Sequence, residues 1–161
     1  MDCIPLSELD RKAVWDWIYK ELSFKPSVRP LDWPSISTQK KYFKFKIDSL
    51  WGAGYSELAH SNFIQQMIDA FIEITTPGDE IYALDWQHDC YYFDPRSLSI
   101  NDMLDDGSSD AKISFIPDGD YYIFLTKDFE NIWFGHPWEK TITVIGDMLI
   151  EAVKTKDLFI S

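Results

Sequence analysis

The short turns between strand-like segments are the feature that most constrains how this chain can fold. From Glu80 onward, apolar and aromatic runs follow one another, with only a few polar residues between most of them. Parallel strands need a long crossover connection, whereas antiparallel strands can be joined by a tight turn. The runs are IYALDW, CYYF, KISFI, DYYIFL, NIWF and TITVI. We therefore predict a mostly antiparallel sheet of four or more strands.

Two further patterns refine this prediction. KISFI and DYYIFL flank Pro117-Asp118-Gly119, which predicts a hairpin because Gly119 can supply a positive φ. Earlier in the chain, KKYFKFKI alternates apolar and basic residues with the period of a half-buried strand. Its lysines, interleaved with aromatic residues, would suit single-stranded nucleic acid. We favour the alternative that they protect an exposed edge strand from aggregation.

Helical periodicity appears in three places. Ser7 can cap a helix over about residues 8–22, and residues 57–74 carry a wide apolar arc at helical spacing. Gly146 precedes a third helical segment, DMLIEAVKT. A chain of 161 residues has the length of one ordinary domain. These patterns predict an α+β protein, with one domain over residues 1–161 and its helices packed on one face of the sheet.

The charge of the chain is concentrated in its second half. The net charge is −12, yet residues 1–75 carry ten acidic and nine basic side chains, whereas residues 76–161 carry seventeen and six. The acidic second half would repel the phosphate backbone of DNA or RNA. We therefore expect no nucleic-acid partner there. It would attract a protein with a basic surface. The alternative, that the charge serves only solubility, stays open.

The chain carries no pattern typical of a membrane or secreted protein. No apolar run is long enough to cross a bilayer, and MDCIPLSELDRK lacks the basic and apolar regions of a secretion signal. Two cysteines, Cys3 and Cys90, do not make a disulfide framework. We expect two free thiols in a reducing cytoplasm.

The segment DWQHDC is the strongest candidate for chemistry. In an extended strand, Asp85 and Asp89 would face one side and His88 and Cys90 the other, so the four can converge only if the backbone bends. Zinc bound by His88, Cys90 and His136 is one possibility, although the ligand spacing matches no known pattern. The commoner role of such a histidine is to hydrogen-bond a carboxylate at a turn. We expect no stoichiometric metal and no cofactor.

Other catalytic motifs are missing from the sequence. It has no nucleophile elbow, no H-E-x-x-H and no glycine-rich phosphate loop. An acid–base pair of Asp120 and His136 is possible, but an ion pair of structural role would look the same. Four aspartates superficially resemble a calcium loop but lack its alternating ligands and terminal glutamate, so a solvated loop is the preferred interpretation. They are Asp102, Asp105, Asp106 and Asp110.

Three motifs give the chain a family resemblance. They are WDWIYKELSFKPS, YALDWQHDCYYFDP and DGDYYIFLTKDFENIWFGHPWEKTITVIG, and together they span nearly the whole chain. In these motifs the chain resembles the bacterial domain-of-unknown-function family catalogued under the number 2716. The resemblance matches no pattern over residues 101–112. It implies a compact, single-domain cytoplasmic protein and brings no established activity or catalytic residues.

Two hypotheses about function follow from these observations. In the first, the protein is an immunity protein whose acidic half masks the basic active site of a toxin. Its partner-binding residues would be Asp102, Asp105, Asp106, Asp110, Asp118, Asp120, Trp133 and Trp138. In the second, it is a small hydrolase-like enzyme that uses Asp85, His88, Asp120 and His136. We also predict that the motifs DWQH and GHPWE are neighbours in space, as the zinc site and a site shared by the two histidines would both require.

Overall fold

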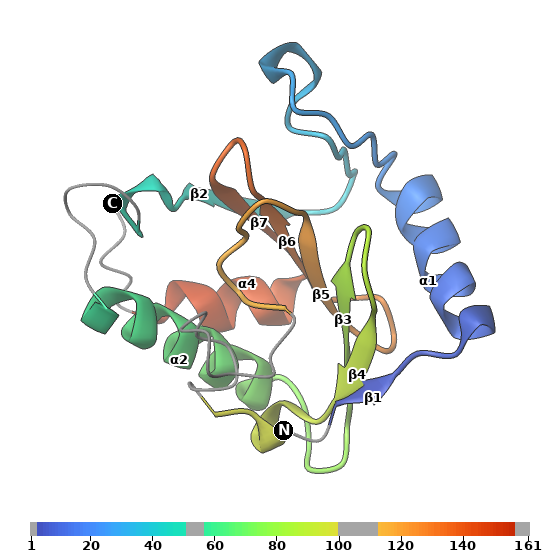
Figure 1. Ribbon diagram of the computed structural model, residues 1–161. Coiled ribbons are helices and arrows are strands. Elements are labelled where there is room, and N and C mark those ends of the chain that lie inside the picture. Colours follow the sequence, from blue (N-terminus) through green and yellow to red (C-terminus); the bar gives the residue numbers. More distant parts are fainter. Residues whose placement is uncertain (1–2, 51–56, 100–112, 157–161) are drawn as a thin grey trace.

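One seven-stranded sheet organises the protein (Figure 1). The computed structural model describes residues 3–50, 57–99 and 113–156. The strand order is β1-β4-β3-β5-β6-β7-β2, and every pairing is antiparallel. The strands are β1 (Ile4–Pro5), β2 (Tyr42–Lys46), β3 (Ile81–Asp85), β4 (Tyr91–Phe93), β5 (Tyr122–Thr126), β6 (Ile132–His136) and β7 (Thr141–Ile145). The predicted α+β class and antiparallel sheet are confirmed.

The predicted helices form close to their expected bounds. They are α1 (Glu8–Glu21), α2 (Glu57–Glu73) and α4 (Asp147–Lys154). Ser7 caps α1, since its hydroxyl accepts a hydrogen bond from the amide of Asp10 at 3.1 Å. Gly146 precedes α4 with φ +108°, and a Cβ there would lie 2.3 Å from the carbonyl oxygen of Glu130. Only glycine fits this junction between β7 and α4 without displacing the backbone.

The helices cover both faces of the sheet, not one. In Figure 1, α2 and α4 lie on one side of the strands and α1 lies on the other. Neighbouring residues of β5 show the division: Phe124 packs with α2 and α4, whereas Ile123 and Leu125 pack with α1. Strands β6 and β7 are buried at every position. Such strands must be covered on both faces, so the expectation of one helical face is corrected.

The predicted hairpin around Pro117-Asp118-Gly119 does not form. Gly119 has the expected positive φ of +75°, but residues 113–120 contain no strand. Both edges of β5 are already occupied, by β3 and β6, so no position is left for another neighbour. Phe115 is fully buried, with its ring centroid 4.2 Å from that of Phe124. The apolar residues of KISFI therefore fill the core as an irregular segment.

Strand β2 lies at one edge of the sheet, as its sequence predicts. Phe43 and Phe45 are half-buried against the core, while Lys44 and Lys46 are exposed. Lysines on an edge strand discourage pairing with a second molecule. Within the described residues, no helix is both long and apolar enough to cross a bilayer.

Candidate functional site

Several turns meet at one end of the sheet, toward the top of Figure 1. Strand β3 ends at Asp85, which lies opposite Tyr122 at the start of β5. Strand β6 ends at His136, opposite Thr141 at the start of β7. The motif DWQH, the segment before β5 and the motif GHPWE therefore share this end, which we call the open end.

The chain turns back on itself directly after β3. Trp86 and Gln87 form a turn, and the amide of His88 donates to the carbonyl oxygen of Asp85 at 3.3 Å. The amide of Trp86 donates to the carbonyl oxygen of Tyr121 at 3.2 Å, which joins this turn to the segment before β5. Because the backbone bends here, the strand alternation that would separate Asp85 from His88 does not apply.

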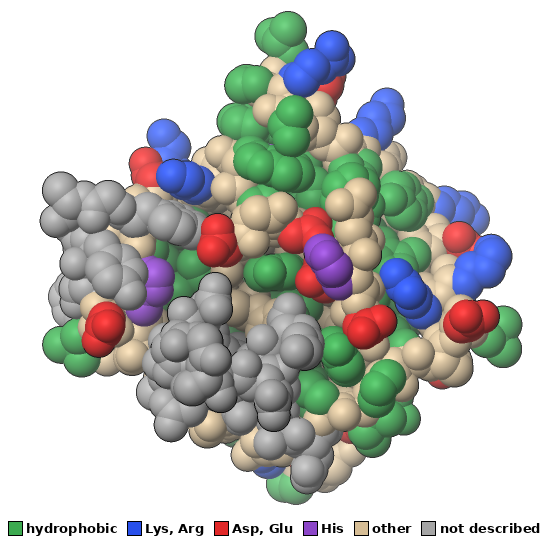
Figure 2. Space-filling model, in the orientation of Figure 1, with side chains coloured by type: hydrophobic (Ala, Val, Ile, Leu, Met, Phe, Trp, Pro, Cys, Tyr) green, Lys and Arg blue, Asp and Glu red, His purple; other side chains and the backbone are tan. Residues whose placement is uncertain are grey.

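The bend brings one imidazole between two carboxylates. His88 Nδ1 lies 3.0 Å from Asp85 Oδ1 and 3.1 Å from Asp120 Oδ2. The side chains of Asp85 and Asp120 are only 6% and 9% exposed, whereas that of His88 is 67% exposed. We call these three residues the DHD cluster. Figure 2 shows, on this face of the molecule, a histidine with acidic side chains directly against it.

The two carboxylates impose unusual proton affinities on the cluster. Burial, together with the hydrogen bond to Asp120, raises the pKa of Asp85 to about 7. Contact with Asp85, and then with Asp120, raises the pKa of His88 above its ordinary value. Two like charges in a poorly solvated place thus favour any cation that comes to them.

His136 belongs to a separate set of contacts. Its Nδ1 accepts a hydrogen bond from the amide of Glu139 at 3.0 Å, and its Nε2 lies 3.1 Å from Ser35 Oγ. The Nδ1 contact leaves Nε2 as the nitrogen that carries the proton, donated to Ser35. The residue is 1% exposed, and burial lowers its pKa to about 4. His136 is therefore a neutral histidine that fixes the turn after β6.

Tyr121 links the two motifs. Its ring centroid lies 5.7 Å from that of Trp86, 4.9 Å from that of His136 and 5.2 Å from that of Trp138. The prediction that DWQH and GHPWE are neighbours is confirmed, with one buried tyrosine between them. Each histidine nevertheless has its own polar partners, so they do not share one site.

Comparison with known proteins assigns the chain to a protein family. Residues 5–150 match the family described as Protein of unknown function (DUF2716). The chain belongs to this family. A relative in Bacillus subtilis (strain 168), "Uncharacterized protein YxiI", is 33% identical over 152 residues, which cover 92% of this chain and 90% of the relative. Among solved structures, none matches.

The DUF2716 fold separates the residues predicted to bind a partner. Asp118 is exposed, Asp120 is a buried member of the DHD cluster, and Trp138 is half-buried beside Tyr121. Trp133 is 0% exposed at the centre of the core, so it offers no surface to a partner. The remaining four, Asp102, Asp105, Asp106 and Asp110, lie outside the described residues.

The zinc set proposed from the sequence is not brought together. Cys90 is buried, and its thiol donates to the carbonyl oxygen of Asp85 at 3.7 Å. His136 is hydrogen-bonded to Ser35. Of the three residues in the zinc set, only His88 is therefore a member of the DHD cluster. The sequence interpretation grouped Asp85, His88 and Asp120 together only in the possible enzyme site, and otherwise named Asp120 as a partner-binding residue and His88 as a zinc ligand. Their convergence depends on the pairing of β3 with β5, which no local pattern reveals.

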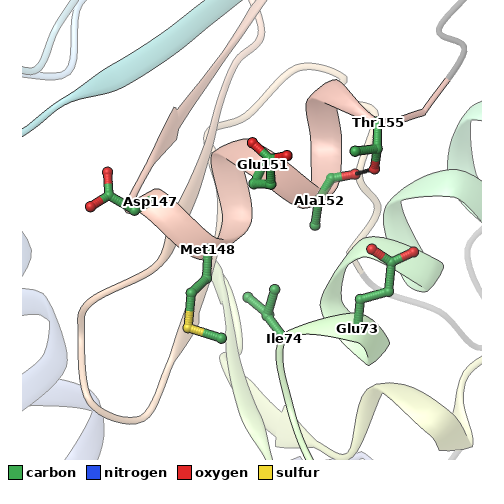
Figure 3. A pocket seen from close by; sticks show the side chains of 7 residues that line it. All are labelled: Glu73, Ile74, Asp147, Met148, Glu151, Ala152 and Thr155. Atoms are coloured by element: carbon green, nitrogen blue, oxygen red, sulfur yellow. Dashed lines mark hydrogen bonds between the residues drawn. The ribbon is translucent and has the colours of Figure 1, made fainter.

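Two surface hollows lie away from the DHD cluster, along α4. One, of about 430 Å³, lies between α4 and the end of α2, where Figure 3 shows Glu73, Met148 and Glu151 around it. The other, of about 440 Å³, borders the start of α4 and includes Lys40 and Lys41. Neither hollow is lined by a member of the DHD cluster or by His136, so we place the candidate site at the open end.

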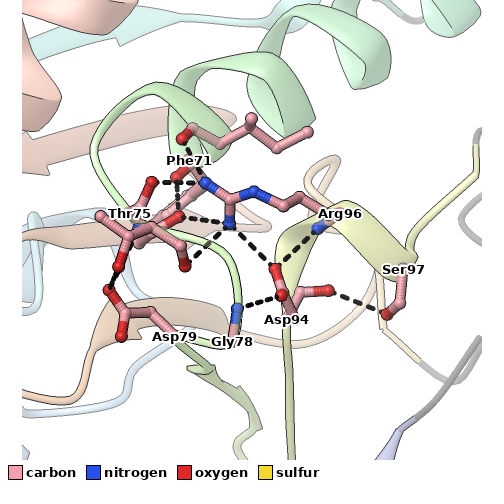
Figure 4. A network of polar contacts seen from close by, with 9 residues as sticks. Phe71, Thr75, Gly78, Asp79, Asp94, Arg96 and Ser97 are labelled. Carbon is pink, nitrogen blue, oxygen red and sulfur yellow. Dashed lines mark hydrogen bonds and ion pairs between the residues drawn. The ribbon is translucent and has the colours of Figure 1, made fainter.

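A second acidic turn lies at the opposite end of the β3–β4 hairpin (Figure 4). There the guanidinium of Arg96 lies 3.0 Å from Asp94 Oδ1. It also donates to the carbonyl oxygens of Ile72, Thr75 and Thr76, which close the end of α2. The amide of Gly78 donates to Asp94 Oδ2 at 2.8 Å. We call this the closed end, because its carboxylate has both a cation and amide donors.

Proposed function

We propose that this protein is an immunity-type protein that binds a basic toxin through its open end and masks the toxin's active site. The binding surface would consist of the DHD cluster, the exposed Asp89 and Asp118, and Trp138. Carboxylates at this surface would take the place of the anionic groups that a basic active site normally binds. The alternative from the sequence, that the charge serves only solubility, predicts no such gathering.

The observation that carries the proposal is that the aspartates of the open end have no lysine or arginine as an ion-pair partner within the described residues. Four aspartates lie in its two turns: Asp85, Asp89, Asp118 and Asp120. Within the described ranges, the ion pairs of these four are the two that Asp85 and Asp120 make with His88. Several acidic side chains elsewhere are paired with lysine or arginine, as Glu139 is with Lys44 at 2.8 Å. Aspartates that form no ion pair with lysine or arginine in the described part of the chain suit a basic partner.

Aromatic side chains border this acidic surface. Trp138 packs edge-on against Tyr121, which directly follows Asp120 in the chain. Trp86 lies on the other side of Tyr121 and donates its Nε1 hydrogen to the Tyr19 hydroxyl at 2.9 Å. Half-buried tryptophans beside charged groups are typical anchors of protein interfaces. Of the two tryptophans in the predicted partner-binding set, the half-buried Trp138 supports this role, whereas Trp133 is buried in the core.

The test measures protection and binding together. The protein would be co-expressed with each toxin encoded beside it in the genome, and survival compared with that given by the Asp89→Asn/Asp118→Asn variant. Affinity of the purified pair would be measured at low and high salt. We expect the variant to bind at least about tenfold more weakly, mainly through slower association, with a smaller salt dependence.

The matched control removes two charges elsewhere. Asp147→Asn/Glu151→Gln changes two exposed acids of α4, on the opposite side of the sheet from α1. This variant should protect as well as the wild type at equal protein levels. Equal loss in both variants would mean that only total charge matters. If the wild type protects against none of the adjacent toxins, the immunity function is wrong.

A second candidate function is favoured by one observation. The exposed imidazole of His88 contacts two buried carboxylates, an arrangement that can orient a general base. The hydrolase-like enzyme expected from Asp85, His88, Asp120 and His136 would have to act without His136, which is held by Ser35. His88→Ala separates the two candidates, since it should abolish turnover of any substrate while leaving most of the toxin affinity.

A further inference from the structure

We propose that Asp85, His88 and Asp120 bind one divalent transition-metal ion, of the Zn²⁺ or Mn²⁺ class, at the open end. The inference goes beyond the proposed function and does not depend on it. It also differs from the zinc set considered from the sequence, because it uses neither Cys90 nor His136.

The geometry of the three side chains fits an ion. Each offers one ligand atom, and all three atoms lie within 4.8 Å of one another. His88 Nδ1 is 3.0 and 3.1 Å from the two carboxylate oxygens. Ligands that bind an ion at about 2.1 Å, at right angles to each other, are about 3 Å apart. At the angles of a tetrahedral site the same ligands would be about 3.4 Å apart. The two separations from His88 are therefore close to those of neighbouring ligands and need a shift of at most a few tenths of an ångström.

The burial of the carboxylates is the second, independent observation. Asp85 and Asp120 are 4% and 6% exposed as whole residues, yet the only ion-pair partner of either, within the described chain, is an imidazole that is itself exposed. Burying two facing carboxylates without a strong cation is costly. A divalent ion would cancel both charges and leave the imidazole neutral.

The surrounding structure holds the ligands in place. The amide of Tyr121 donates to Asp120 Oδ1 at 2.9 Å, which leaves Oδ2 directed toward His88. The guanidinium of Arg11, from α1, donates to the carbonyl oxygen of His88 at 3.1 Å. The amide of Trp86 donates a hydrogen bond to the carbonyl oxygen of Tyr121, and this contact ties the two ligand-bearing turns together. Such outer contacts keep a metal site assembled before the ion arrives.

The donor set indicates the class of ion. One imidazole nitrogen with two carboxylate oxygens suits zinc, manganese and similar ions, whereas magnesium prefers oxygen ligands and retains its water. Three protein ligands leave at least one coordination position open, and the exposed side of His88 faces solvent. That position would hold water, or a donor atom from a molecule bound at the open end.

The experiment uses the full chain without an affinity tag, stripped of metal with EDTA and dialysed. Zn²⁺ and Mn²⁺ would be titrated separately by calorimetry, and thermal unfolding followed at each ratio. We expect one ion per chain and a rise in melting temperature for the wild type. Asp85→Asn, Asp120→Asn and His88→Ala should each weaken binding at least tenfold. His88 is exposed, so its variant remains informative even if the aspartate variants unfold.

Three control variants decide the outcome. Asp118→Asn tests general acidity, and Cys90→Ser and His136→Gln test the other ligand set; all three should bind like the wild type. Failure of the wild type to bind either ion, or equal loss in Asp118→Asn, would overturn the metal site. Toxin binding would be measured with and without EDTA, so loss of the metal site and failure of the proposed immunity function are distinguishable.

Discussion

The two ends of the β3–β4 hairpin neutralise their acidic turns in different ways. At the closed end, Asp94 is paired with Arg96 and with backbone amides, and the same guanidinium closes the end of α2. At the open end, the ion-pair partner of both Asp85 and Asp120 among the described residues is the imidazole of His88, and one backbone amide, that of Tyr121, donates to Asp120. The closed end is complete within the chain and serves stability. The open end has carboxylates that no lysine or arginine of the described chain neutralises, as the proposed partner-binding role requires.

The contrast teaches that burial alone does not show whether a carboxylate is neutralised within the chain. Asp94, with a side chain 26% exposed, is more accessible than Asp85 and yet is fully paired. Although partial burial acts to raise it, donors from Arg96 and Gly78 hold the pKa of Asp94 below its usual range. The difference lies in the partners, and stability measurements can therefore test it.

The largest expected effect is at the closed end. Arg96→Ala removes five hydrogen-bond contacts and leaves Asp94 and three carbonyl oxygens without their cation. We expect a loss of about 3 kcal/mol in the free energy of unfolding, measured by urea denaturation. Arg96→Lys keeps the charge but not the planar fork, and should recover only part of it. A loss below about 1 kcal/mol would show that this end is not the structural one.

The next effect concerns the second histidine of the open end. His136 has a pKa of about 4 when folded and about 6.5 when unfolded, so only the unfolded chain takes up its proton between these values. Its contribution to stability is therefore complete above pH 6.5 and declines as the pH falls toward 4. The loss should reach about 3 kcal/mol at most. Glu139 and Lys44 face this histidine, and of the two only Glu139 favours its protonation.

His136→Gln isolates this contribution. The variant keeps a polar group near Ser35 and the amide of Glu139 but cannot take up a proton. The difference in unfolding free energy between wild type and variant should therefore shrink from pH 7 to pH 4.5. A difference that does not change with pH would mean that His136 is accessible to protons in the folded protein.

A smaller effect, of opposite sign at the two ends, sharpens the comparison most directly. Asp85→Asn removes a charge that faces Asp120, so in metal-free solution at pH 8 it should leave stability unchanged or raise it by about 1 kcal/mol. Asp94→Asn removes a charge that Arg96 and Gly78 require, and should lower stability by about 1–2 kcal/mol. Destabilisation of equal size in both variants would contradict the functional interpretation of the open end.

The smallest effect is expected at the exposed edge of the open end. Asp118→Asn should change the free energy of unfolding by no more than about 0.5 kcal/mol, because the side chain is exposed and lies in a loop. Thermal and urea unfolding at pH 7 would both check this. A larger loss would indicate that Asp118 holds the segment before β5 in place, and would make it unsuitable as a control for the metal titration.

The sequence by itself determined most of the local structure. Helices α1, α2 and α4 and the strands β2 to β7, except for the assignment of KISFI, lie where periodicity, capping and turn residues predict them. These signals arise from contacts within a few residues, so they can be read without knowledge of the fold. The family resemblance was equally accessible, because its motifs are continuous in the chain.

Only the tertiary structure decided where those elements lie and which side chains meet. The cover of both faces, the irregular path of Phe115 and the full burial of Trp133 follow from which strands pair and in what order. The DHD cluster depends on a turn after Asp85 and on the register that places Asp85 opposite Tyr122, beside Asp120. Asp85 and Asp120 are thirty-five residues apart in sequence. Register between strands is a property of the whole sheet, and no local pattern encodes it.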